Sequence, residues 1–101
     1  MKLNYREVSG EIVPTVIEEI NGANLLFVEV GTNGKKGGDS GYGCRTYIKI
    51  VDESGTDIKA RSIDTEDRKN AGVEIMLGGD SELNTIIEAL KFCTKILEQS
   101  A

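Results

Sequence analysis

The sequence contains no histidine and no tryptophan, and only two cysteines and one proline occur in its 101 residues. Without histidine, the Ser-His and Cys-His pairs that activate a nucleophile are not available. Cys44 and Cys93 each lack a second cysteine nearby, so the spacing of a zinc site is missing, and no pattern supports a disulfide between them. We therefore expect a protein that is not an enzyme, holds no metal and needs no cofactor.

Long apolar runs and broad basic clusters are lacking as well. No stretch approaches the ~18 apolar residues of a membrane span, and the first residues lack the apolar core of a signal peptide. The net charge is −5, and the basic cluster consists of Lys35 and Lys36, extended by Arg45 if the loop folds back. Binding to extended nucleic acid is therefore disfavoured. We expect a cytoplasmic protein with reduced thiols and no membrane partner.

The length and the periodicity of the chain predict one α+β domain over residues 1–101. Alternating residues predict strands in EIVPTVIEEI, NLLFVEV, CRTYIKIVD and VEIML, and a weaker, solvated or edge strand in DIKARSI. Asn21-Gly22 predicts a hairpin after the first of these, although a short helix from Thr15 to Ile20 is an alternative. In VEIML, Val73, Ile75 and Leu77 are expected to point inward. We expect about five mainly antiparallel strands packed against one C-terminal amphipathic helix.

This helix is predicted to run from about Ser81 to about Gln99, with Asp80 or Ser81 as its N-cap. The stripe expected to face the sheet is centred on Leu90 and contains Leu83, Ile86, Ile87, Leu90, Cys93, Thr94 and Leu97. A second apolar flank consists of Ala89, Phe92 and Ile96. Phe92 is either a single exposed aromatic residue or part of a subunit contact. We expect a homo-oligomer that pairs through this flank.

The segment GTNGKKGGDSGYG predicts a long glycine-rich loop between two strands. Glycine lets a backbone approach a ligand closely, lysine and arginine bind phosphate or carboxylate, and tyrosine stacks on a base. The order of residues fits neither a Walker loop nor a dinucleotide fingerprint. The alternative is a mobile hairpin tip without a ligand. The candidate ligand-binding residues of the loop are Lys35, Lys36, Asp39, Ser40, Tyr42, Arg45 and Thr46.

A second Gly-Gly-Asp-Ser stretch, residues 78–81, lies between the last predicted strand and the helix. Free amides at a helix N-terminus can bind an anion, which adds Asp80 and Ser81 to the candidate ligand-binding residues. The carboxylate of Asp80 favours a capped helix instead, because it fills those amides and repels phosphate. If the two stretches meet in space, Asp39 and Asp80 can pair as acid and base or hold Mg²⁺, which is the enzymatic alternative.

The combination of VEVGTNG…GGDSGYGCRTY, EIMLGGDSEL and an amphipathic C-terminal helix resembles a family of small uncharacterised proteins of Firmicutes and their phages. The resemblance extends from Phe27 to Leu97 and implies a compact α+β unit without a settled activity. A phage setting favours two roles, which are a sponge that sequesters a nucleotide immune signal and an inhibitor that docks on a host defence protein.

Two functional hypotheses follow from these patterns. The first is non-enzymatic binding of a small anionic ligand, with a nucleotide signal as the leading candidate, through the loop Gly31–Thr46. A hairpin tip cannot enclose a ligand alone, so this hypothesis requires a neighbouring cavity or subunit boundary. The second is a protein-interaction module or inhibitor whose acidic surface or edge strand docks on a partner.

Overall fold

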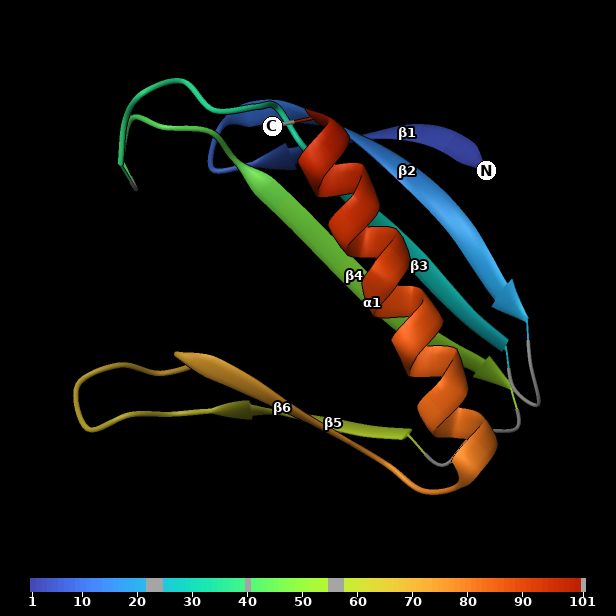
Figure 1. Ribbon diagram of the computed structural model, residues 1–101. Helices are drawn as coiled ribbons and strands as arrows, with labels where there is room; N and C mark the ends of the chain where they lie inside the picture. The colour runs from blue at the N-terminus through green and yellow to red at the C-terminus, as the bar shows by residue number, and fades with distance from the viewer. Residues whose placement is uncertain (22–24, 40, 55–57, 101) are drawn as a thin grey trace.

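A computed structural model of the chain describes residues 1–21, 25–39, 41–54 and 58–100. Within these residues, β1–β4 form one antiparallel sheet in chain order, β5 and β6 form a separate antiparallel pair, and one helix follows (Figure 1). The α+β class is therefore confirmed. The elements are β1 (Lys2–Val8), β2 (Glu11–Asn21), β3 (Leu25–Thr32), β4 (Thr46–Ser54), β5 (Ile58–Ile63), β6 (Gly72–Leu77) and α1 (Asp80–Ser100).

Strand β1 is the element that the sequence pattern does not predict. It pairs with β2 from Lys2 opposite Ile17 to Val8 opposite Glu11. Its burial reverses the usual alternation, because the polar residues Asn4 and Arg6 are half-buried and bind a glutamate, whereas Leu3 and Tyr5 on the other face are 77% and 67% exposed. Strand β2 continues through Thr15–Ile20, which excludes the alternative helix. The antiparallel pairing of β2 with β3 agrees with the predicted hairpin, although Gly22 lies outside the described residues.

The core lies between α1 and the centre of the four-stranded sheet. Leu26, Val28 and Val30 alternate along β3, are fully buried and point to the same side, in agreement with the alternation of NLLFVEV. They meet Ala89 and Cys93 of the helix. Helix α1 packs mainly on β3 and less on β2 (Figure 1). Its ends agree with the prediction within one residue.

The helix, however, turns a different face to the sheet than predicted. Its buried residues are Thr85, Ala89 and Cys93, whereas Leu90, the predicted centre, is 53% exposed. The true centre is Ala89, one position earlier and about 100° around the helix. Small residues let the helix approach the sheet closely, and larger side chains flank this contact; they are Ile86, Phe92, Ile96 and Leu97.

This rotation corrects the predicted subunit contact. Ala89 is fully buried, and Phe92 and Ile96 pack against the core cluster. The flank that was expected to pair two chains is therefore occupied within one chain. The apolar residues on the outside of α1 are instead Leu83, Ile87 and Leu90, which are 57%, 39% and 53% exposed.

Strands β5 and β6, with the turn that joins them, form an arm, residues 58–77. The arm stands apart from the four-stranded sheet beyond β4 (Figure 1), and Ile58 at its base packs against the core cluster. Val73 and Ile75 were expected to point inward, but they are 68% and 42% exposed. The prediction was wrong because the arm does not join the core, although the strands themselves form as expected.

The molecule is a flat slab that measures 40 × 38 × 18 Å. Its radius of gyration is 14.9 Å, whereas a compact chain of this length has about 13 Å. Its accessible surface is 6962 Å², against about 5,600 Å² for a typical monomer of this mass. The isolated chain therefore exposes about 1,400 Å² more than usual. The described part of the chain contains no helix with the length and apolarity of a membrane span.

Candidate functional site

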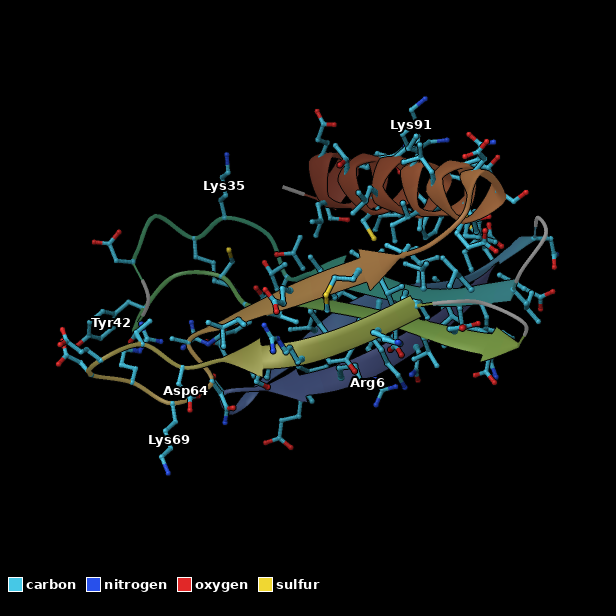
Figure 2. The ribbon with its side chains drawn as sticks, turned by 90° about the horizontal axis from the view of Figure 1, so that it is seen from below. Arg6, Lys35, Tyr42, Asp64, Lys69 and Lys91 are labelled. Carbon is cyan, nitrogen blue, oxygen red and sulfur yellow. The ribbon has the colours of Figure 1, made fainter. Side chains whose placement is uncertain are left out.

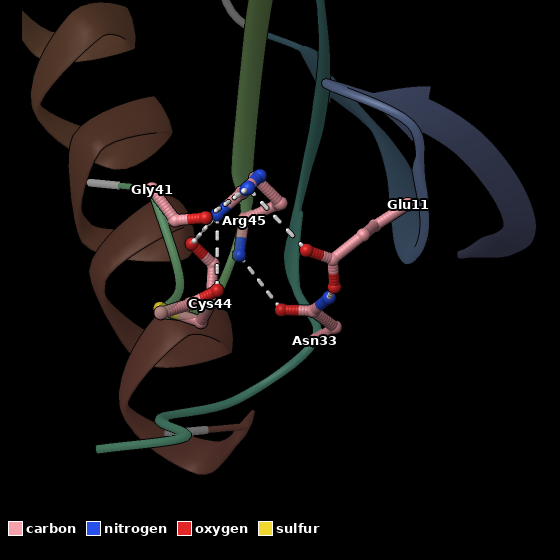
Figure 3. A network of polar contacts seen from close by, with 6 residues as sticks. Glu11, Asn33, Gly41, Cys44 and Arg45 are labelled. Carbon is pink, nitrogen blue, oxygen red and sulfur yellow. Dashed lines mark hydrogen bonds and ion pairs between the residues drawn. The ribbon is translucent and has the colours of Figure 1, made fainter. Parts of the chain in front are cut away.

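The glycine-rich loop is held at its base by Arg45 (Figure 3). The guanidinium forms an ion pair with Glu11 at 3.4 Å, and the Arg45 side chain is only 14% exposed. Asn33 joins the two residues, because its Oδ1 accepts from the Arg45 amide at 2.7 Å and its Nδ2 donates to Glu11 at 3.2 Å. The guanidinium also donates to three loop carbonyls, those of Gly41, Gly43 and Cys44. Arg45 therefore stabilises the loop through its two terminal guanidinium nitrogens, whereas its buried Nε has no hydrogen-bond partner among the described residues.

Two glycines of the loop, Gly38 and Gly43, allow close packing of backbone against backbone. Both Tyr42 and Gly43 donate their amides to the carbonyl of Asp39, at 2.9 and 2.6 Å. A side chain on Gly43 would collide with the carbonyl oxygen of Gly38, and one on Gly38 would lie 2.8 Å from the backbone of Tyr42. The absence of side chains thus allows the two halves of the loop to touch.

The remaining candidate residues of the loop do not converge on a pocket. Lys35, Lys36 and Asp39 are exposed, and Tyr42 is 88% exposed (Figure 2). Thr46 donates to Thr32 Oγ1 at 3.2 Å at the base of the loop. Ser40 lies outside the described residues. Binding of a small anion by this loop stays a prediction, with Lys35, Lys36 and Tyr42 as the accessible groups.

The two Gly-Gly-Asp-Ser stretches lie at opposite ends of the helix. Gly34 of the loop is close to the carbonyl of Ser100, at the last turn of α1, whereas Asp80 begins the helix. Twenty residues of helix separate these ends by about 30 Å. The candidates Asp80 and Ser81 therefore cannot join the loop residues in one site of a single chain. The same distance rules out an acid–base or Mg²⁺ pair of Asp39 with Asp80 there.

The second stretch acts as the start of the helix. The first intrahelical bond runs from the Leu83 amide to the Gly79 carbonyl at 3.1 Å, so Gly79, and not Asp80 or Ser81, is the N-cap. Gly79 has φ +108°, and a side chain there would collide with the carboxylate of Glu82. The glycine meets a backbone requirement that other residues satisfy poorly.

A polar cluster on the sheet face opposite α1 was not predicted from the sequence. Glu29 is buried there and accepts two hydrogen bonds from Arg6, at 2.8 and 2.6 Å. Asn4 and Thr15 donate to the same carboxylate at 3.1 and 2.7 Å. The Arg6 guanidinium also lies 5.2 Å from the centre of the Tyr47 ring. Figure 2 shows Arg6 on the side of the sheet away from the helix. The sign of this cluster in the sequence was Glu29, the single charged residue in the apolar run LLFVEV.

The electrostatics of this cluster indicate a structural role. The hydrogen bonds from Arg6, with help from Thr15 and Asn4, lower the pKa of Glu29 from 4.5 to about 2, although burial opposes this shift. The same contact raises the pKa of Arg6. Both oxygens of the carboxylate already have donors, and proton transfer near neutral pH is disfavoured. The cluster ties β1, β2 and β3 together.

The exposed apolar groups are the surface features that remain without a role inside the chain. One group lies on the outer face of α1, a second lies on the arm, and further exposed apolar residues lie on β1, β2 and β4, namely Leu3, Tyr5, Ile12 and Ile48. Both cysteines are free thiols, and burial raises the pKa of Cys93. No group of three or more His, Cys, Asp and Glu side chains in the described segments is placed to hold a metal ion.

Comparisons with known proteins add no further constraint on function. No model of a protein family matches the chain, and neither a curated protein nor a solved structure shows significant similarity to it. The interpretation therefore depends on the exposed surfaces themselves.

Proposed function

We propose that this chain is a non-enzymatic protein-interaction module that docks its arm on a partner protein with a basic surface. The observation that supports this function is the open apolar face of the arm, where Val73 and Ile75 are 68% and 42% exposed. A two-stranded ribbon is only marginally stable in water, so burial of one face against a partner stabilises it.

The register of β5 and β6 separates an apolar face from a charged one. Ala60 lies opposite Ile75, and Ser62 lies opposite Val73, so these four side chains share one face. The other face contains Lys59, an ion pair between Arg61 and Glu74, and Met76, which is 46% exposed. The first face is thus free of charged side chains, whereas the second carries three of them.

The distribution of charge indicates the kind of partner. The arm contains four basic and four acidic residues, so the net charge of −5 comes from the rest of the chain. An acidic body attracts a basic partner over a distance. The apolar face of the neutral arm can then be buried without removing a charge from water. An inhibitor that docks on a host defence protein is the form of this proposal that the family resemblance favours.

Site-specific photo-crosslinking in cells that carry the gene tests the proposal. A photoreactive side chain at Val73 is expected to give one discrete crosslinked product with a basic protein. The matched control places the same group at Lys59, on the opposite face of the arm, and is expected to give no such product. The proposal is contradicted if position 73 yields no discrete product, or if it yields only crosslinks between two copies of this chain.

A further inference from the structure

We propose that a second copy of this chain packs on the outer face of α1, along a seam formed by Leu83, Ile87, Leu90 and Thr94. These residues are spaced by four, three and four positions, which is the spacing of the a and d residues of a coiled coil. The inference concerns a surface separate from the arm and does not depend on the role of the arm.

The seam is open to another chain. Helix α1 faces β3 and β2 with Thr85, Ala89 and Cys93, and the seam lies on the outer flank. Lys91, beside the seam, points away from the sheet (Figure 2). The three apolar residues of the seam are 57%, 39% and 53% exposed in chain order. Apolar side chains at regular spacing on one exposed helix face favour packing against a second helix.

The surface of the chain is large enough for a stable dimer. The accessible surface exceeds that of a typical monomer by about 1,400 Å², to which both the arm and the open face of α1 contribute, and a standard interface buries about 800 Å² per partner. The slab is only 18 Å thick, so one helix layer covers one sheet layer. A second copy packed on the helix side would cover the exposed face of α1 and make the assembly thicker than the single chain.

The charges beside the seam favour a copy of the same chain as the occupant. The exposed charged side chains there are three acids, Asp80, Glu88 and Glu98, and two bases, Lys91 and Lys95. This face therefore carries a net charge of −1, whereas the chain carries −5. Two acidic chains repel each other least where they meet through a surface with little net charge. A two-fold axis makes such a surface complementary to itself.

In an antiparallel pair of helices, each residue of the seam contacts a seam residue of the partner subunit. With the two-fold axis between Ile87 and Leu90, Ile87 contacts Leu90 of the partner subunit, and Leu83 contacts Thr94 of the partner subunit. The same arrangement opposes the two helix dipoles, which a parallel pair would align unfavourably. The sheets then lie on the outside of the assembly.

Light scattering after size exclusion tests this dimer on the purified chain. The wild type is expected to have about twice the 10.9 kDa mass of the chain at micromolar concentration. Leu90→Glu is expected to give the single-chain mass, because it places a charge in the apolar contact. Gln99→Glu adds the same charge to an exposed position of α1 outside the seam, and it is expected to keep the dimer.

The controls separate this dimer from other outcomes. Circular dichroism checks that Leu90→Glu retains its helix, and Ile87→Lys serves as a second seam variant if it does not. A monomeric wild type overturns the proposal, and so does a dimer that both seam variants leave intact. If the wild type is dimeric and Ile75→Glu alone dissociates it, the arm forms the contact and the seam is wrong. An unchanged mass of the Ile75→Glu variant supports the seam.

Discussion

Glu29 connects three strands through one carboxylate. Arg6 and Asn4 reach it from β1, and Thr15 reaches it from β2. The carboxylate is almost completely buried, and its pKa of about 2 is well below the ordinary value of 4.5. Because the folded state holds the charged form more tightly than the unfolded chain does, this residue links stability to pH.

The sign of this linkage gives a prediction. Glu29 should contribute its full stabilisation above pH 4.5, and the contribution should disappear as the pH falls to about 2. We expect Glu29→Gln to lower the free energy of unfolding at pH 7 by about 1–3 kcal/mol. Urea unfolding at a series of pH values should show this difference between wild type and variant shrinking below pH 4.5. The exposed Glu98→Gln serves as the control, and a constant difference down to pH 2 would contradict the assignment.

The role of Arg45 was harder to predict from the sequence than its position at the base of the glycine-rich loop. The sequence places a cation in a glycine-rich loop, which is typical of anion binding. Its principal partner, Glu11, is the first residue of β2 and is distant along the sequence, so the local pattern contains no sign of this pairing. The glycines were interpreted as room for a ligand, whereas at Gly38 and Gly43 the structure fills that room with the backbone of the loop itself.

At the scale of the elements, periodicity predicted where strands and the helix form better than which way they face. Strands β2, β3, β4 and β6 alternate clearly enough to be predicted, and the helix ends followed from its flanking residues. The helix carries two overlapping apolar stripes, and hydrophobicity alone favours Leu90 over Ala89. Close packing instead places Ala89 at the centre of the contact, because a small residue lets the helix approach the sheet most closely. Likewise, the alternation in β6 does not reveal that the strand lies outside the core.

The orientation of α1 leads to a second prediction. Ala89→Leu should lower the free energy of unfolding by about 1–3 kcal/mol, because the site against β3 is fully occupied. Glu88→Leu introduces the same side chain at the neighbouring exposed position, and we expect a change within about 0.5 kcal/mol. Chemical unfolding of both variants compares the two effects. Equal losses would indicate that Ala89 does not face the sheet.

The whole molecule consists of a packed body and an attached arm. The body shares a core between its sheet and α1, whereas the arm has its own two-stranded pairing. Local stability follows the number of buried apolar contacts, so the two parts should open independently. The same separation contributes to the surface and the radius of gyration by which the chain exceeds the values expected for its size.

Hydrogen exchange of the free chain should distinguish these two parts. We expect the amides of β5 and β6 to exchange much faster than the paired amides at the centre of β3, because the arm opens without unfolding the body. Exchange measured by NMR or by mass spectrometry of peptides provides the comparison. Equal protection of Ile75 and Val28 would show that the arm belongs to the cooperative core.

The chain-order arrangement of β1–β4 has a consequence for biosynthesis. From β2 onward, each strand of this sheet pairs with the strand made just before it, so the sheet can form stepwise as the chain leaves the ribosome. Helix α1, which shields Leu26, Val28 and Val30, follows every strand along the chain. During translation this apolar surface is therefore complete before its cover has been synthesised, and the nascent sheet is a natural substrate for chaperones until the helix docks.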